Sequence, residues 1–305
     1  MTYLIDNYIP KYTKLFRSSK LKEKKEVLNK ILESCILCPR QCKVNRKKGE
    51  IGYCKSGNLA KVSSFNPHFG EEDCLVGRGG SGTIFFTNCN LGCVFCQNYD
   101  ISHLGKGSEV SYEELASYML SLQELGCINI NLVTPTHFIP QIVEALIIAT
   151  HKGLNLPLVY NSSGYENVQI LKILEGIIDI YMPDAKYFHQ EISKKYSNAK
   201  DYPEVMKNSL KEMHRQTGDL IFNDCGEAQR GLLIRHLVLP HNLAGTKELV
   251  SFIVNEVSPN TYINVMAQYR PMFKASQYEL INRLITIEEF EKAKNYALDK
   301  ALILV

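Results

Sequence analysis

The chain has 305 residues, 45% of them hydrophobic and 22% charged, which excludes the disordered and fibrous classes and predicts a substantial core. The formal net charge of +3 is small for this size and gives no indication of a nucleic-acid partner. We find no apolar run long enough for a signal peptide or for the roughly 20 residues of a membrane span. We therefore expect a cytoplasmic protein that binds neither nucleic acid nor membrane.

The N-terminal segment is rich in lysine, but its apolar residues recur at helical spacing. Leu21, Leu28, Ile31 and Leu32 would share one face of a helix whose other face carries the basic side chains. A solvated helix face explains this pattern, and a nucleic-acid-binding arm is the less favoured alternative.

Four cysteines follow this helix: Cys35, Cys38, Cys42 and Cys54. In a reducing cytoplasm they are not expected to form disulfides. Four thiolates make a closed metal site, and such a site suits an iron–sulfur cluster or zinc. We expect the metal to stabilise this short segment, which belongs to a Cys-rich, metal-binding appendage over residues 1–80.

The glycine-rich segment 77–82 resembles a phosphate-binding loop at first sight. Phosphate binding needs glycines that open a helix, whereas this segment precedes an apolar run typical of a strand. We interpret it as a turn that leads into the main domain.

From residue 81 onward, short apolar runs alternate with longer segments of helical periodicity. We expect strands at 83–87, 128–133, 158–161, 177–182, 232–239 and 261–267, and helices at 112–125, 138–150, 168–175, 203–216, 247–255 and 287–298. Six βα units with right-handed crossovers predict an α/β fold, a partial (βα)6 TIM-like barrel over residues 81–305. Ser111 with Glu114 predicts a capping box, and Thr136 and Thr246 are candidate caps.

A second set of cysteines, Cys89, Cys93 and Cys96, comes directly after the first predicted strand with the spacing C-x3-C-x2-C. Three thiolates can bind three irons of a 4Fe–4S cubane, which leaves the fourth iron open to a small molecule. The alternative is a zinc knuckle, for which His103 is the local candidate for a fourth ligand.

This motif and its position at a strand end resemble the radical S-adenosylmethionine (SAM) superfamily. The resemblance implies that SAM chelates the open iron through its amino and carboxylate groups. It also implies that one electron splits the sulfonium into methionine and a 5′-deoxyadenosyl radical, which abstracts a hydrogen atom from the substrate. Phe95 takes the place of the side chain that packs near the adenine in that family.

The resemblance extends over nearly the whole chain to activating enzymes of glycyl radical proteins, and more closely to the pyruvate formate-lyase activating enzyme-like branch. The matching stretches are 38–40, 68–72, 80–87, 97–98, 133–137, 161–165, 183–186, 235–240 and 266–271. The implied SAM pocket contains Asn161, Asp184, Lys186 and Arg235, with the methionine carboxylate held by Lys186 and Arg235. Asp184 would accept from ribose hydroxyls or hold a monovalent cation together with Ser162 and the Met182 backbone.

Three points about this pocket stay open. Many members carry Gly-Gly-Glu after the second strand to bind the SAM amino group, whereas this chain has Thr134 and backbone carbonyls there. Asp184 and Lys186 would equally form an ordinary strand-end ion pair, with Arg235 a solvated residue at the barrel mouth. His137 is either a catalytic acid or base or, more commonly for this position, a packing residue.

The barrel mouth is expected to bind the substrate through polar side chains: His68, Glu71, His236, His241, Gln268, Tyr269 and Arg270. Of the remaining cysteines, Cys127 is expected in the core, Cys74 either packs or reaches the active site, and Cys225 lies in a loop.

The favoured function is hydrogen-atom abstraction by a radical SAM enzyme, for example from a glycine of a partner protein, with flavodoxin or ferredoxin as reductant. A radical SAM isomerase, epimerase or peptide-modifying enzyme is the alternative within this class, because fold and cofactor do not determine the substrate. A non-catalytic metal-binding or electron-transfer module is the alternative of a different class.

Overall fold

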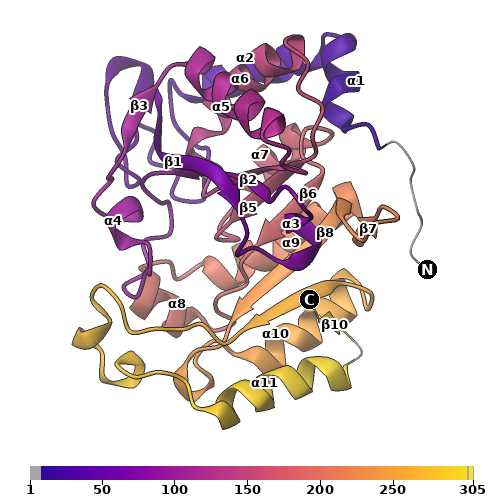
Figure 1. The fold of residues 1–305 in the computed structure, drawn as a ribbon. Helices are drawn as coiled ribbons and strands as arrows, with labels where there is room; N and C mark the ends of the chain where they lie inside the picture. The colour runs from indigo at the N-terminus through magenta and orange to yellow at the C-terminus, as the bar shows by residue number, and fades with distance from the viewer. Residues whose placement is uncertain (1–7, 301, 305) are drawn as a thin grey trace.

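A computed structural model describes residues 8–300 and 302–304 (Figure 1). In this part of the chain, ten strands form one sheet of order β10-β9-β8-β6-β5-β4-β2-β1-β3, with β7 paired to β8. The adjacent pairs from β2 through β4, β5, β6, β8, β9 and on to β10 are parallel. Helices cover the outside of this curved sheet, so the chain has the predicted α/β fold of a partial, TIM-like barrel.

Each predicted strand and helix of residues 81–305 is present within a few residues of its expected bounds. The strands are β2 (Ser81–Phe86), β4 (Ile130–Val133), β5 (Leu158–Ser162), β6 (Ile180–Pro183), β8 (Ala228–Leu237) and β9 (Tyr262–Met266). The helices are α5 (Tyr112–Glu124), α6 (Ile139–His151), α7 (Val168–Leu174), α9 (Tyr202–Thr217), α10 (Thr246–Phe252) and α11 (Ile287–Asp299). Buried parallel strands have continuous apolar runs and surface helices have a 3.6-residue period, which is why the sequence revealed both.

Several other elements were not predicted. They are α3 (Asp73–Val76), α4 (Tyr99–Ser102), α8 (Gln190–Ser197), β1 (Ala60–His68), β3 (Ser108–Val110), β7 (Ile221–Phe222) and β10 (Ile303–Leu304). Strand β1 pairs antiparallel with both β2 and β3 and exposes much of its second half. Such a strand near a sheet edge has no apolar run to reveal it.

The N-terminal helices are α1 (Lys11–Arg17) and α2 (Lys20–Ile31), separated at Ser19, whose φ is 61°. Leu21 and Leu28 of α2 are buried, and Lys22 between them is exposed, whereas Lys24 and Lys25 are half-buried and reach the Ile173 carbonyl and Glu144. The predicted amphipathic helix is therefore confirmed. Among the described residues, every helix is too short or too polar to cross a membrane.

Of the predicted caps, the structure confirms the capping box of Ser111 and Glu114. The other two predictions are wrong, because both threonine hydroxyls are bonded elsewhere. Thr136 lies in a 3-10 turn and donates to Glu166 at 2.8 Å, and Thr246 lies 2.8 Å from the His236 ring.

The glycine-rich segment is a turn between α3 and β2, as predicted. At Gly79, a Cβ would lie 1.7 Å from the Gly126 carbonyl oxygen, so a side chain does not fit. The preceding α3 buries Cys74 and Leu75 against the inward residues Val159 and Ile180. Cys74 therefore packs in the barrel interior, Cys127 is in the core as expected, and Cys225 is exposed.

Candidate active site

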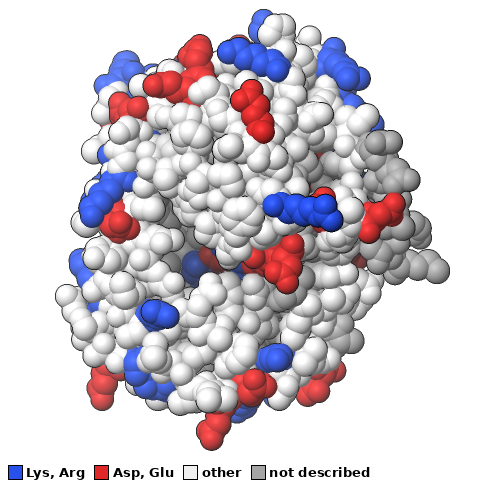
Figure 2. Space-filling model, in the orientation of Figure 1, with Lys and Arg blue, Asp and Glu red and all other residues white. Residues whose placement is uncertain are grey.

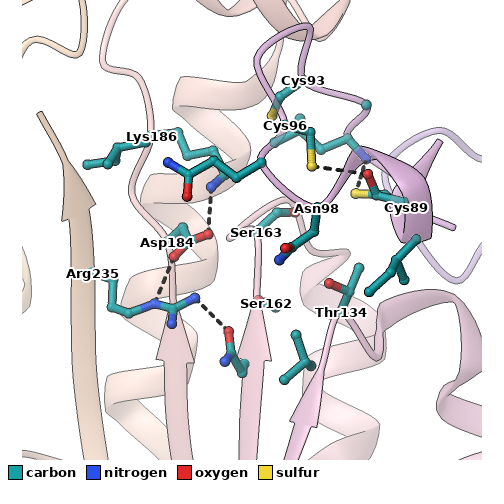
Figure 3. Close-up of a pocket in the computed structure, with 18 of the residues that line it drawn as sticks. Cys89, Cys93, Cys96, Asn98, Thr134, Ser162, Ser163, Asp184, Lys186 and Arg235 are labelled. Carbon is teal, nitrogen blue, oxygen red and sulfur yellow. Dashed lines mark hydrogen bonds and ion pairs between the residues drawn. The ribbon is translucent and has the colours of Figure 1, made fainter. Parts of the chain in front are cut away.

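A cavity of about 260 Å³ lies at the carboxyl ends of the parallel strands (Figure 3). Its lining includes every residue predicted to bind the 4Fe–4S cubane, hereafter the first cluster, or SAM: Cys89, Cys93, Phe95, Cys96, Thr134, Asn161, Ser162, Asp184, Lys186 and Arg235. These side chains come from the ends of different strands, which meet at one edge of a parallel sheet. Figure 2 shows the face of the molecule with a central hollow, at whose rim acidic and basic side chains lie together.

The cysteine loop begins at the end of β2, where Asn88 adopts a φ of 66°. Cys89 Sγ accepts from the Leu91 amide at 3.3 Å, and Cys93 Sγ accepts from the Ser197 hydroxyl at 3.1 Å. The Ser102 hydroxyl lies 3.0 Å from Cys96 Sγ. Hydrogen bonds to the sulfurs tune iron–sulfur clusters, so each of the three thiols already has a suitable neighbour.

The donor set fits a cubane better than a single ion. Burial, and then the neighbouring Cys93, raises the pKa of Cys89 to about 12, so a metal has to displace a proton from this thiol. No three Cys, His, Asp or Glu side chains within residues 8–300 and 302–304 converge closely enough to hold one metal ion. In a cubane each thiolate binds its own iron, so the three sulfurs need not share one centre.

His103, the candidate fourth ligand of a zinc knuckle, has other partners. Its Nε2 lies 2.9 Å from the Cys93 carbonyl oxygen, and its ring stacks on Phe273 with centroids 4.3 Å apart. The ring therefore packs against the cysteine loop and supports its conformation.

Asp184 connects the charged side chains on the other wall of the cavity. Its Oδ2 lies 2.6 Å from Lys186 Nζ and its Oδ1 lies 2.9 Å from Arg235 Nε (Figure 3). Arg235 also donates through Nη2 to Asn161 Oδ1 at 2.7 Å, which links β5, β6 and β8. The expected strand-end ion pair thus exists, but Arg235 is part of it and is not the solvated residue of the alternative interpretation.

This arrangement keeps all three groups charged. Burial acts to raise the pKa of Asp184, but Arg235 and Lys186 outweigh it and lower that pKa. Burial acts to lower the pKa of Lys186 and of Arg235, but mainly the Asp184 carboxylate outweighs it and raises both. The site therefore presents two permanent cations to the cavity, held by one carboxylate.

Tyr202 of α9 joins the two strand ends from behind the cavity. Its hydroxyl accepts from the Lys186 amide at 3.0 Å and lies 2.9 Å from the carbonyl oxygens of both Ser163 and Asp184. Gly164, with a φ of 72°, allows this close approach, because a Cβ there would lie 2.3 Å from the Asp184 carbonyl oxygen. The sequence analysis missed Tyr202, since no local pattern reveals a contact between a helix start and two strand ends.

Thr134 has a backbone conformation that β-branched residues rarely adopt. Its φ is 58°, and its amide donates to the Asn161 carbonyl oxygen at 2.8 Å. Left-handed backbone costs an L-residue about 1–2 kcal/mol, and such strain is concentrated at functional sites. The residue that replaces the Gly-Gly-Glu pattern is thus strained and lines the cavity.

Two histidines proposed for catalysis or substrate binding do not line the cavity. His137 is 1% exposed, its Nε2 lies 2.8 Å from the Thr87 carbonyl oxygen, and burial lowers its pKa to about 3. His236 is fully buried between the Ala185 carbonyl oxygen and Thr246, and burial lowers its pKa to about 4. Both are neutral packing residues, because the chain gives each a backbone partner and no access to solvent.

The other residues expected at the mouth lie in different places. Gln268 lines the cavity, and Glu71 lies 3.7 Å from Arg235 with His68 3.5 Å beyond it. Tyr269 is buried and donates to the Ile281 carbonyl oxygen, so it supports Phe95 by an edge contact at 5.5 Å. Arg270 is exposed, and His241 lines a separate cavity beside α11.

The four N-terminal cysteines lie in a segment held together mainly by backbone hydrogen bonds. Cys35 exchanges backbone hydrogen bonds with Lys43 and Val44 at 2.9 Å each, and Cys42 Sγ accepts from the Tyr53 amide at 3.3 Å. Burial raises the pKa of Cys38 and of Cys54, and for each the Cys35 thiol adds to this rise. The Cys35 thiol therefore lies close enough to Cys38 and Cys54 to influence both.

Comparison with known proteins gives three findings. The family profile described as "Radical SAM superfamily" matches residues 83–223. The uncharacterized protein MJ0674 of Methanocaldococcus jannaschii is 33% identical over 283 residues, which cover 90% of this chain and 77% of that protein. Among solved structures, a radical SAM methyltransferase from Sphaerobacter thermophilus is similar with a TM-score of 0.50 and 12% identity, over 73% of this chain and 65% of that one.

A second solved structure, HydG, a maturase of the [FeFe]-hydrogenase, is similar with a TM-score of 0.46 and 11% identity. This match covers 70% of this chain and 47% of that one. The chain thus spans somewhat under two thirds of the first of these solved structures and about half of the second.

Proposed function

Because this chain belongs to the radical SAM superfamily, we propose that it binds a 4Fe–4S cluster on Cys89, Cys93 and Cys96 and SAM in the adjoining cavity. The observation that carries this proposal is that three thiols and two carboxylate-held cations line one cavity at the strand ends. We further propose an enzyme of the pyruvate formate-lyase activating enzyme-like branch, whose substrate is a glycine of a partner protein.

When bound, the cluster would pass one electron from a flavodoxin- or ferredoxin-class reductant to SAM, which would yield methionine and a 5′-deoxyadenosyl radical able to take one hydrogen atom from the glycine Cα.

The chain's own residues position SAM in this proposal. Lys186 and Arg235 have N–H groups beyond those bonded to Asp184 and Asn161, and these would donate to the methionine carboxylate. Phe95, which Tyr269 holds by an edge contact, would lie beside the adenine. Thr134 would offer its carbonyl to the amino group, and Asn161 and Ser162 line the cavity next to it. Lys186 and Arg235 already neutralise Asp184, so this proposal needs no monovalent cation there.

We propose a second metal site on Cys35, Cys38, Cys42 and Cys54, in an appendage of residues 1–80 beside a catalytic domain of residues 81–305. Four thiolates suit both zinc and an iron–sulfur cluster. We favour the cluster, because the cell must already supply iron and sulfide for the cluster on Cys89, Cys93 and Cys96.

The proposal is tested by anaerobic reconstitution, iron and sulfide analysis, and a reductant-driven assay for 5′-deoxyadenosine. We expect Cys93→Ala to abolish SAM cleavage while iron remains at the second site, and Cys38→Ala to impair folding or turnover. If SAM leaves the properties of the reconstituted cluster unchanged and no 5′-deoxyadenosine forms, the proposal of a radical SAM enzyme is wrong. If the Cys93→Ala variant contains zinc and no iron, the second site does not hold an iron–sulfur cluster.

The substrate is tested by isotope transfer. Candidate partner proteins carrying glycine deuterated at Cα are incubated with the reduced enzyme and SAM. Deuterium in 5′-deoxyadenosine identifies a glycine as the hydrogen donor. Deuterium transfer from a small metabolite, with none from any glycine, would assign the chain to the isomerase or epimerase class.

A further inference from the structure

Arg40 lies between Cys38 and Cys42 and joins the segment of the four N-terminal cysteines, the second metal site, to the Cys89–Cys96 loop, the first. Its Nε donates to the Asn90 carbonyl oxygen and its Nη2 to that of Leu91, each at 3.1 Å. Nη2 also donates to the Ser197 carbonyl oxygen at 3.1 Å, and Nη1 donates to that of Asn198. A single guanidinium thus bonds four carbonyl groups, two of them between Cys89 and Cys93.

Tyr53, which precedes Cys54, makes the second connection. Its ring lies 3.9 Å from the Arg40 guanidinium, and its hydroxyl donates to the Leu91 carbonyl oxygen at 3.3 Å. Its backbone amide donates to Cys42 Sγ at 3.3 Å. The opposite ends of one residue therefore touch a thiol of the second site and the loop of the first.

The contact continues to the sulfur of Cys93. Ser197 at the end of α8 accepts from Arg40 through its carbonyl oxygen and donates through its hydroxyl to Cys93 Sγ at 3.1 Å. The loop is tied to α8 a second time, because the Val94 amide donates to the Tyr196 carbonyl oxygen at 2.8 Å. Arg40 is thus two hydrogen bonds away from a ligand of the first cluster.

We propose that Arg40 and Tyr53 are positioning residues, through which metal at the second site holds the Cys89–Cys96 loop in its cluster-binding conformation. This inference rests on the proposed second metal site. A metal ligated by Cys38, Cys42 and Cys54 immobilises both residues, since each lies within two positions of a ligand. Without the metal, this short segment keeps its hydrogen bonds and packing but has no covalent cross-link between its cysteines, so the loop loses a rigid support.

The test compares the retention of the first cluster in variants of the full, anaerobically reconstituted chain. Arg40→Met removes the donors and keeps the stem, Tyr53→Phe removes one hydrogen bond, and Tyr53→Leu removes the ring. Lys43→Met, in the same loop, is the matched control, since Lys43 contributes none of these side-chain contacts. A chain with Cys38→Ser and Cys54→Ser lacks the second metal.

Iron release to a chelator and the low-temperature electron paramagnetic resonance spectrum, with and without SAM, are the readouts. We expect Arg40→Met to speed loss of the first cluster about tenfold or more and to alter its SAM-induced spectral change, as outer ligand partners commonly do. We expect Tyr53→Leu and the double serine variant to lose the first cluster about as fast as Arg40→Met. Tyr53→Phe should lose it more slowly than these, and Lys43→Met at the wild-type rate. Arg40→Lys, which reaches fewer carbonyls, should fall in between if Arg40→Met fails to fold.

Two outcomes distinguish a failure of the coupling through Arg40 and Tyr53 from a failure of the proposed second metal site. If the wild-type chain binds a second metal, but Arg40→Met and the double serine variant keep the first cluster as well as the control does, the coupling is wrong. If the chain binds no metal at the four N-terminal cysteines, the second site itself is wrong. In either case, unchanged SAM cleavage would still support the proposed cluster on Cys89, Cys93 and Cys96.

Discussion

Asp184 and Arg235 lie opposite one another where β6 and β8 end, and their side chains form an ion pair of 2.9 Å across this rung. The two strands also pair at Ile180 and Tyr181, and the Ala185 amide donates to the Arg235 carbonyl oxygen at 2.7 Å. Backbone and side chains thus lock the same two positions. This register places the mostly buried guanidinium on the cavity wall across from the cysteine loop (Figure 3).

Arg235→Met should weaken SAM binding about 10- to 100-fold, because a hydrogen bond to a charged group is worth about 1.5–3 kcal/mol. Calorimetric titration of the anaerobically reconstituted protein measures this loss. The control, Lys211→Met, removes a surface ion pair with Glu256 that is about half exposed and should leave SAM affinity unchanged. Equal SAM affinity in Arg235→Met and the wild type would exclude Arg235 from the binding site.

Thr134→Gly should raise the free energy of unfolding by up to about 1 kcal/mol, because glycine adopts positive φ without the strain of a β-branched residue. The gain is partial, since glycine also makes the unfolded chain more flexible. Thr134→Ala keeps a Cβ at a φ of 58° and is the control without this relief. Denaturant unfolding measures both variants, and a Gly variant no more stable than the Ala variant would show that the backbone there is unstrained.

Tyr202→Phe should destabilise the protein by about 1–3 kcal/mol, because the buried Lys186 amide loses the hydroxyl that accepts from it. The loop ends that hold Asp184 and Ser163 would loosen, so SAM affinity should fall as well. The control is Tyr296→Phe, whose hydroxyl lies 3.1 Å from that of Ser251 in a partly buried position. Thermal unfolding and SAM titration should separate the two variants; similar values for both would count against the bridging role of Tyr202.

Asp179 should make stability depend on pH. It is fully buried before β6 and accepts from the Leu158 amide at 3.0 Å and the Lys11 amide at 3.2 Å, yet burial raises its pKa from 3.8 to about 6. Because the folded-state pKa lies above the unfolded value, this group's contribution to stability falls as pH rises from about 4 to about 6 and is constant above that.

Asp179→Asn removes this titration. Relative to the wild type, the variant should therefore gain about 1.4 kcal/mol between pH 5 and pH 8, since about one pKa unit of titration lies in that interval. Its absolute stability is lower at any one pH if the amide fails to accept from Leu158. Only the change in the difference between variant and wild type tests the prediction, and a constant difference would contradict it.

Local patterns in the sequence determined much of the fold. The strands β2, β4, β5, β6, β8 and β9 contain runs of buried apolar residues, and α5 and α11 begin with capping boxes that span only four consecutive positions. The α11 box of Thr286 and Glu289 was not predicted, although the same signal was present. Elements without such a signal, β1 and α8, became visible only in the structure.

The sequence likewise revealed some features of the site, and the structure alone revealed the others. Cys89, Cys93 and Cys96 are recognisable from spacing alone, because a cluster loop binds its metal within eight consecutive residues. The barrel sequence likewise indicated that Asp184, Lys186 and Arg235 stand at strand ends. Only the tertiary structure decided their pairing, the strain at Thr134, the burial of His137 and His236, and the connection from Arg40 to Cys93. Those relationships join residues up to about 160 positions apart, and such contacts depend on how the strands and helices pack, which no local pattern encodes.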